Sequence, residues 1–211
     1  MDEEESKSGF SRRDLLKIVG GAGVGIALSG ALWLEDGIAA IPASRGYLLV
    51  DLKKCGGCLN CMLACSLAHE GKVNLSRSRI QVLQNSFAHV PDDLTVAQCR
   101  QCVSPACLEA CPTGALHPDS KQGNIRVIDV AQCIGCRSCL EACSFAPGRV
   151  VWNPETNRAA KCDLCAEAPF WNQQGGPEGK QACIEICPRR ALRFTEKIPP
   201  QQGDKGYILP R

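Results

Sequence analysis

Residues 133–143 read Cys133-Ile-Gly-Cys-Arg-Ser-Cys-Leu-Glu-Ala-Cys143, and this run of cysteines decides the fold. Three thiols at intervals of two residues let one loop wrap a cubane cluster and offer a ligand to three of its irons. A fourth thiol, three residues later, begins a helix that points toward a second cluster. The same C-x2-C-x2-C-x3-C spacing starts again at Cys55. The pattern predicts paired [4Fe–4S] clusters enclosed by short loops.

The cysteine motif occurs four times and uses all 16 cysteines of the sequence. The motifs comprise Cys55, Cys58, Cys61 and Cys65; Cys99, Cys102, Cys107 and Cys111; Cys133, Cys136, Cys139 and Cys143; and Cys162, Cys165, Cys183 and Cys187. The second and fourth motifs carry longer loops before their third cysteine, and each is followed by a proline. Ser66 and Ser144 stand at that position in the other two motifs, which removes no ligand. Four [4Fe–4S] clusters are expected.

Zinc binding and disulfide bonds are the two alternatives to iron–sulfur clusters. Zinc usually takes two C-x2-C pairs separated by a longer spacer, and only the fourth motif fits that arrangement. Disulfides would suit an even number of cysteines in an exported protein, but rarely repeat one dense spacing four times. The spacing therefore favours iron–sulfur chemistry over a zinc-binding structural protein or a disulfide scaffold.

The N-terminal segment resembles a twin-arginine export signal. Ser11-Arg-Arg-Asp-Leu-Leu-Lys17 is followed by a glycine-rich apolar stretch from Ile18 to Leu34. We interpret residues 1–39 as a signal peptide that is removed, with a retained anchor as the alternative. Because this route exports folded proteins, clusters would be assembled in the cytoplasm. The expected location is the periplasm or the outer face of the cytoplasmic membrane.

Composition and motifs exclude several function classes. The 211-residue chain has a net charge of +2 and only 5% aromatic residues, which disfavours nucleic-acid binding. His69, His89 and His117 are the only histidines, and none stands at metal-ligand spacing from another. No phosphate loop or nucleophile motif occurs in a fitting context. The sequence predicts no catalytic residue and no small-molecule substrate of its own.

Short strand-like runs flank the motifs and predict a loop-rich α+β fold. The runs are Tyr47–Asp51, Arg79–Leu83, Asn124–Val130, Arg149–Trp152 and Leu192–Thr195. One helical turn is expected before the last cysteine of a motif, as in Leu108–Cys111 and Leu140–Cys143. The expected polar linkers are Asn85–Asp93, His117–Asn124, Pro169–Lys180 and Ile198–Gly206.

Chain reach favours a nested arrangement of tandem bacterial-ferredoxin-like modules, each with two clusters. Cys99 to Cys143 forms one self-contained eight-cysteine unit, which leaves the first motif to pair with the fourth. We expect one domain over residues 46–196, with an inner unit at 95–152, an outer unit at 46–83 plus 158–196, and an irregular tail at 197–211. Strands at Tyr47–Asp51 and Leu192–Thr195 would then pair. Sequential pairing of motifs is the alternative.

Residues 47–196 resemble the four-cluster electron-transfer subunits of the DMSO reductase type. The matching residues are Cys99-Arg-Gln-Cys, Pro105-Ala-Cys, Cys111-Pro-Thr-Gly-Ala, Cys133-Ile-Gly-Cys and Lys161-Cys-Asp-Leu-Cys. The resemblance implies cluster 1 on Cys55, Cys58, Cys61 and Cys187; cluster 2 on Cys99, Cys102, Cys107 and Cys143; cluster 3 on Cys133, Cys136, Cys139 and Cys111; and cluster 4 on Cys162, Cys165, Cys183 and Cys65.

The resemblance also implies a function: relaying electrons in an exported oxidoreductase complex. The implied partners are a molybdenum or tungsten pterin subunit and a quinone-reactive membrane subunit or cytochrome. A free-standing soluble polyferredoxin is the alternative. Near the motifs, His69 is interpreted as a surface residue, and Lys161 either tunes a cluster or is solvated. Trp152 and Trp171 are interpreted as packing residues.

Overall fold

A computed structural model describes residues 41–90, 92–202, 206 and 207 of the protein. The described residues belong to one compact unit, which begins at Ile41. The export signal expected at residues 1–39 lies outside the described residues, as do parts of the tail. Within the described residues, the longest helix has 11 residues, and none has the length and apolar character needed to cross a membrane.

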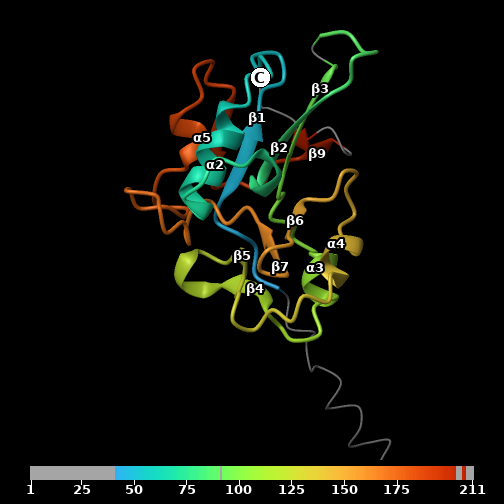
Figure 1. Cartoon of the computed structure of the whole chain (residues 1–211), viewed down its shortest axis with the longest axis vertical. Coiled ribbons are helices and arrows are strands. Elements are labelled where there is room, and N and C mark those ends of the chain that lie inside the picture. Colours follow the sequence, from blue (N-terminus) through green and yellow to red (C-terminus); the bar gives the residue numbers. More distant parts are fainter. Residues whose placement is uncertain (1–40, 91, 203–205, 208–211) are drawn as a thin grey trace, which may run out of the picture. The chain divides into compact units, whose positions relative to one another are not determined.

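The fold consists of short strands and short helices joined by loops, as expected of a loop-rich α+β protein (Figure 1). The elements are β1 (Tyr47–Val50), α2 (Asn60–Glu70), η1 (Leu75–Arg77), β2 (Ile80–Gln84), β3 (Leu94–Gln98), α3 (Ala106–Glu109), β4 (Leu116–Asp119), η2 (Ser120–Gln122), β5 (Ile125–Ile128), α4 (Ser138–Glu141), β6 (Val150–Asn153), β7 (Arg158–Lys161), α5 (Ala182–Glu185), β8 (Leu192–Thr195), β9 (Gln201–Gln202) and β10 (Gly206–Tyr207).

The described strands form five antiparallel pairs and no larger sheet. Four pairs join neighbours in sequence: β2 with β3, β4 with β5, β6 with β7, and β9 with β10. The fifth pair joins β1 to β8, with Tyr47 opposite Thr195 and Val50 opposite Leu192. The two ends of the cysteine-containing segment therefore meet in one ladder.

The helices also associate in two pairs. Helix α2 of the first motif lies beside α5 of the fourth, and α3 of the second lies beside α4 of the third (Figure 1). Each of the three later helices has only four residues, too few for stability alone, so their conformation depends on packing. Helix α2 is longer and ends at Gly71, whose left-handed φ of 65° lets its N–H bond the carbonyl of Leu67.

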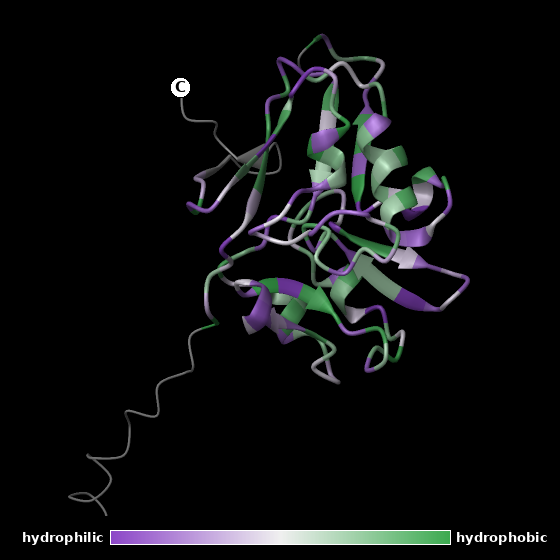
Figure 2. Ribbon diagram, turned by 90° about the vertical axis from the view of Figure 1, so that its left-hand side faces the viewer, coloured by the Kyte–Doolittle hydropathy of each residue, from purple (hydrophilic) through white to green (hydrophobic). Residues whose placement is uncertain are grey.

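Two main apolar cores lie among the paired strands and helices. The larger contains Leu48, Ile80, Val96, Leu164 and Leu192 together with several cysteines. The smaller one gathers around Leu116, Ile128 and Val150, again with cysteines packed against it. Figure 2 shows hydrophobic residues concentrated in strands and helices, with hydrophilic residues in several of the turns. Because cysteines are part of both cores, the chemistry of the thiols and the stability of the fold are linked.

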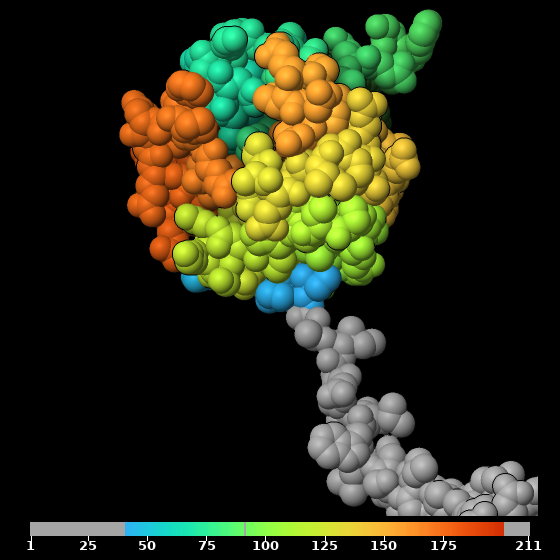
Figure 3. Space-filling view, turned by 60° about the horizontal axis from the view of Figure 1, so that its bottom comes forward, coloured from blue at the N-terminus to red at the C-terminus, as the bar shows by residue number. Residues whose placement is uncertain are grey.

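Segments close in sequence also stay together on the surface. On the face drawn in Figure 3, residues between 100 and 150 on the colour bar cover one continuous area. The segment that follows, drawn in orange, borders that area.

One expected linker is wrong in part. The sequence predicts that His117–Asn124 is irregular, but its first residues belong to β4 and the next three form the 3-10 turn η2. Pro118 has no N–H to donate and would disfavour a central strand, yet β4 has only β5 as a neighbour and tolerates it. The expectation of an irregular tail is also wrong in part, because Gln201–Gln202 and Gly206–Tyr207 form a short ladder.

Candidate metal centres

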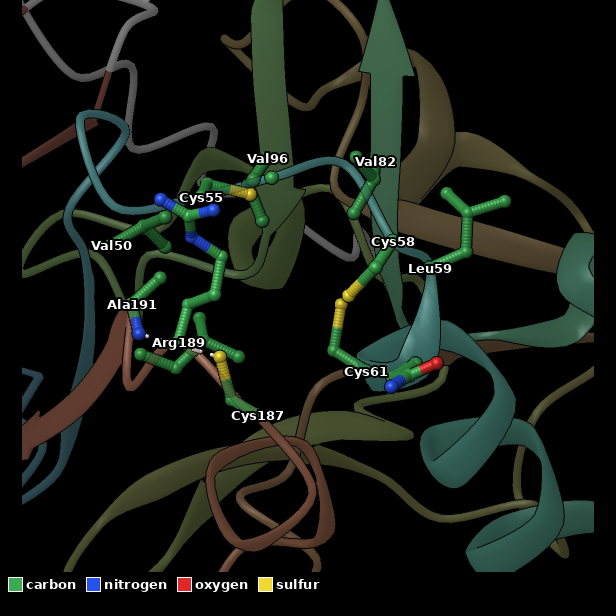
Figure 4. Close-up of a pocket in the computed structure, with 13 residues that line it drawn as sticks. Val50, Cys55, Cys58, Leu59, Cys61, Val82, Val96, Cys187, Arg189 and Ala191 are labelled. Atoms are coloured by element: carbon green, nitrogen blue, oxygen red, sulfur yellow. Dashed lines mark hydrogen bonds between the residues drawn. The ribbon is translucent and has the colours of Figure 1, made fainter.

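Site 1 is a cavity beside β2 and β3. Its cysteines are Cys55, Cys58, Cys61 and Cys187. The first two lie in the loop that enters α2, the third lies in the first turn of that helix, and the fourth follows α5. Figure 4 shows these side chains around one shared space, with Arg189 next to them. Residues separated by more than 120 positions in sequence therefore meet at this site.

Sites 2 and 3 exchange their last cysteines. Site 2 is lined by Cys99, Cys102, Cys107 and Cys143, and site 3 by Cys133, Cys136, Cys139 and Cys111. The exchange follows from the packing of α3 beside α4, because each helix carries its terminal cysteine toward the other motif's loop. The cavities of sites 1, 2 and 3 measure about 410, 380 and 330 Å³ with their open mouths included.

Site 4 is the most enclosed of the sites. Its cysteines are Cys65, Cys162, Cys165 and Cys183, and all four are buried. Burial raises the pKa of the Cys183 thiol well above its ordinary value, and the neighbouring Cys162, Cys165 and Cys65 raise it further. The four sets of cysteines brought together by the fold are the same sets that the family resemblance assigns. That they bind iron remains a prediction at this point.

All four loops share one backbone feature. The residue before the second cysteine of each motif has a left-handed φ: Gly57 (65°), Gln101 (48°), Gly135 (75°) and Leu164 (57°). This conformation curls the backbone so that successive N–H groups turn toward one side, which forms a concave site for negative charge. Glycine adopts it freely, whereas Gln101 and Leu164 are held in it by their buried side chains.

The last cysteine of each of the four motifs accepts a backbone hydrogen bond. The pairs of donor N–H and acceptor Sγ are Arg79 to Cys65 (3.3 Å), Leu116 to Cys111 (3.4 Å), Arg149 to Cys143 (3.2 Å) and Ala191 to Cys187 (3.3 Å). The last of these is drawn in Figure 4. Such bonds stabilise a thiolate and its cluster, and they hold the sulfur in a fixed direction.

The donor sets fit [4Fe–4S] clusters. Burial and neighbouring thiols raise the pKa of Cys61 and Cys107 to about 12 and that of Cys139 to about 11. Four such thiols can lose their protons together only when a cationic centre replaces the protons on sulfur. Four thiolates are the ligand set of a [4Fe–4S] cluster. Among the described residues, no three His, Cys, Asp or Glu side chains converge closely enough for a single metal ion.

The interpretation of His69 as a surface residue is wrong. Its side chain is 7% exposed and lies one helical turn after Cys65 in α2, which turns it inward. His69 Nδ1 lies 2.9 Å from the carbonyl oxygen of Cys65, and Nε2 lies 2.9 Å from Asp163 Oδ1. Arg79 Nη1 donates to the other oxygen of Asp163 at 2.8 Å. Burial lowers the pKa of His69, but bonds to Asp163 and Cys65 outweigh it and raise the pKa to about 9.

This network also acts on a cysteine. Burial raises the pKa of Cys65, but the contacts with His69 and the N–H of Arg79 outweigh burial and lower it. The buried carboxylate of Asp163 is matched by its two cationic neighbours, as a buried charge must be. Two features of the sequence could have predicted this network. His69 follows Cys65 by four residues, and Asp163 directly follows Cys162.

The structure also describes the other three residues interpreted from the sequence, which are Lys161, Trp152 and Trp171. Lys161 ends β7 and is 2% exposed, so the interpretation of Lys161 as a solvated residue is wrong. Trp152 packs against the smaller core, and Trp171 packs against buried Ala68, Cys165 and Ala182. Both tryptophans are therefore packing residues, as interpreted from the sequence.

The four sites lie in the order 1, 4, 2, 3. Cys162 and Cys183 of site 4 lie in the larger core, and Cys61 of site 1 and Cys99 of site 2 pack against that core. Cys107 of site 2 and Cys111 of site 3 pack against the same small core. Each end of the row has one exposed cysteine, Cys58 in site 1 and Cys136 in site 3. The cysteines of site 4 are all buried, and those of site 2 are all partly buried.

Comparison with known proteins adds a family to this geometry. The pattern of the 4Fe–4S dicluster domain matches residues 92–197. The thiosulfate reductase electron transfer subunit of Salmonella typhi is 32% identical over 152 residues, which cover 70% of this protein and 73% of that subunit. A subunit of the anaerobic dimethyl sulfoxide reductase of Escherichia coli K12 is 32% identical over 177 residues, or 76% of this protein and 79% of the subunit.

A third relative is much longer than the protein. The beta subunit of the NADH-dependent phenylglyoxylate dehydrogenase of Aromatoleum evansii is 35% identical over 164 residues. The matched residues are 76% of the present sequence but only 33% of that subunit. The protein thus spans about a third of the length of this relative, and most of the length of the two reductase subunits.

Proposed function

Because the protein belongs to the 4Fe–4S dicluster domain family, we propose that it is an electron-transfer subunit that carries four [4Fe–4S] clusters in a row. The thiosulfate reductase relative is named as an electron transfer subunit, and another relative from Escherichia coli K12 is named as a putative electron transport protein. The observation that carries the number four is the gathering of 16 cysteines into four sets of four. Each cluster has the number of the site whose cysteines hold it. The cysteine motifs form two nested pairs, the first motif with the fourth and the second with the third.

The residues of the protein hold and insulate these groups. Each bound cluster supplies a centre that accepts and releases one electron. The left-handed loop residues and the N–H donors to sulfur fix the ligands, while the larger apolar core encloses Cys65, Cys162 and Cys183 of site 4. Exposed Cys58 and Cys136 mark the ends of the row as the places where electrons enter and leave.

The partners follow from the relatives. We propose a molybdenum or tungsten pterin subunit at one end, and a quinone-reactive membrane subunit or a cytochrome at the other. The names of relatives in dimethyl sulfoxide and thiosulfate reductases support a multi-subunit oxidoreductase. The alternative hypothesis is a soluble polyferredoxin whose partners diffuse to it. Purification from native membranes distinguishes the two hypotheses, because a monomer in the soluble fraction would contradict the complex.

Anaerobically purified protein is expected to contain about 16 iron atoms and as much acid-labile sulfide, four of each per site. Iron analysis and sulfide release measure both. Zinc in place of iron would end the proposal, since four thiolates per site also suit zinc. About eight irons would mean that only one nested pair is loaded.

We also propose export by the twin-arginine route, supported by Arg12 and Arg13 before the apolar stretch. Replacing both by lysine keeps the charge but removes the paired guanidinium groups. The variant is expected to accumulate in the cytoplasm with its iron intact, as followed by fractionation and immunoblotting. Replacing Lys53 and Lys54, which lie beyond the signal, by arginine is the control. Normal export of the Arg12→Lys, Arg13→Lys variant would refute this route.

A further inference from the structure

Cationic side chains surround site 2 in a way that distinguishes it from the other sites. Three of them line its cavity together with the four thiols: Arg100, Arg149 and Lys161. A fourth, Arg126, is buried beside them, and its N–H donates to Oε1 of Gln101, the residue before Cys102, at 2.7 Å. Lys161 is 2% exposed and Arg126 is 1% exposed. Among the described residues that line this cavity, there is no carboxylate.

Lys161 is held in place by neutral groups. Its Nζ donates to the backbone carbonyl of Arg126 on β5, and to that of Cys162 at 3.3 Å. The guanidinium of Arg126 donates to the carbonyls of Pro42 (2.8 Å) and Asn124 (2.6 Å). Carbonyl oxygens orient these cations without cancelling their unit charge. Both side chains therefore keep their positive charge next to site 2.

The position of Lys161 places its charge at this site. Lys161 lines one cavity together with Cys99, Cys102, Cys107 and Cys143. Because Lys161 also precedes Cys162 of site 4, it stands between two adjacent sites of the row but lines the cavity of site 2.

The other sites have weaker or mixed charges. At site 4 the buried carboxylate of Asp163 lies between Cys162 and Cys165 in sequence, and its Oδ1 accepts from the N–H of Cys165 at 3.0 Å. Its negative charge opposes the charges of its two cationic neighbours, Arg79 and His69. Arg189 at site 1 and Arg137 at site 3 are exposed, so water screens them.

We infer that this buried set of cations, with Lys161 as a positioning residue for charge, gives site 2 the highest reduction potential of the four. The inference rests on the proposed presence of four clusters. When site 2 takes up one electron, its total charge becomes one unit more negative, and no bond or proton need move. A buried cation stabilises that added charge strongly because little solvent screens it. The first electron to enter the row therefore comes to rest in site 2.

The test is a potentiometric titration of the full-length protein with dithionite, followed by electron paramagnetic resonance. In the unmodified protein, the signal with the highest midpoint potential is expected to be the one that Cys143→Ser abolishes, because Cys143 lines site 2. If Cys143→Ser abolishes a signal of lower potential instead, the inference is wrong. This comparison does not require any change to Lys161.

Lys161→Met then removes the charge and keeps the length of the side chain. The reduction equilibrium of the site 2 signal is expected to shift about tenfold toward the oxidised form, or about 59 mV for one electron. Lys161→Arg should restore the potential, and Lys121→Met, at an exposed lysine of η2, should leave all four signals unchanged.

The outcomes separate the two proposals. A shift confined to the signal that Cys143→Ser abolishes supports the inference. Four clusters with no shift, or with the shift on another signal, would overturn it and leave the electron-transfer function intact. Protein without four cluster signals would instead contradict the proposed function itself.

Discussion

Cys183→Ala is expected to abolish the folded state, whereas Cys136→Ala should lose one cluster from a protein that stays folded. Cys183 is the second residue of α5 and lies inside the larger core, which also contains Leu164 and Leu192. Without a cluster in site 4, three buried thiols would surround a space in the centre of that core. Binding energy at such a site is also folding energy, and it is comparable to the whole stability of a domain, about 5–15 kcal/mol.

Cys136 is the matched comparison because it is exposed at the outer end of the row. Its loss affects only the small core around site 3, and the ladders of β1 with β8 and β2 with β3 remain. We expect Cys136→Ala to retain about 12 iron atoms, from three full clusters. Circular dichroism, size-exclusion chromatography and iron analysis of both variants provide the measurement. Equal folding and equal iron in the two would show that the clusters do not support the core.

Cys143→Ser is expected to remove the cluster of site 2, although Cys143 belongs to the same motif as the cysteines of site 3. The reason is the exchange between α3 and α4, which brings Cys143 to the cavity of Cys99, Cys102 and Cys107. Serine binds iron less well than a thiolate, so the cluster that loses a ligand changes its spectrum or is lost. The paramagnetic resonance signal that disappears identifies the site.

The reciprocal variant provides the control for this exchange. Cys111→Ser should abolish the same signal as Cys136→Ala, because both cysteines line site 3. Cys143→Ser should abolish the same signal as Cys102→Ser. If Cys143→Ser and Cys136→Ala abolish one common signal, each motif keeps its own last cysteine and the nested pairing is wrong.

Much of the fold follows from local patterns in the sequence. The five strand-like runs correspond to β1, β2, β5, β6 and β8, and the expected pairing of the first with the last is confirmed. Strands β3, β7, β9 and β10 lie outside the predicted runs. Strand β4 is not predicted either, because Pro118 and Asp119 have low strand propensity. Its conformation comes from the partner β5, and a partner is not visible in a local window of sequence.

The environment of the sites is harder to predict. Gly57 and Gly135 indicate a turn before the second cysteine, but Gln101 and Leu164 adopt the same left-handed conformation without any such signal. The burial of His69 depends on Asp163, a residue 94 positions away. Likewise, Lys161 is buried only because β5 offers it a backbone carbonyl. Such contacts are formed by tertiary packing, which composition and spacing do not encode.

The ladder of β1 with β8 has a consequence for biosynthesis. The ribosome delivers Cys55, Cys58 and Cys61 long before Cys187, and it delivers Cys65 before Cys183. Synthesis proceeds at roughly 5–20 residues per second, so these thiols wait several seconds for their partners. Sites 2 and 3, whose cysteines all lie between Cys99 and Cys143, are complete earlier. We expect maturation to begin in the middle of the sequence, and a product truncated before Leu192 to remain half assembled.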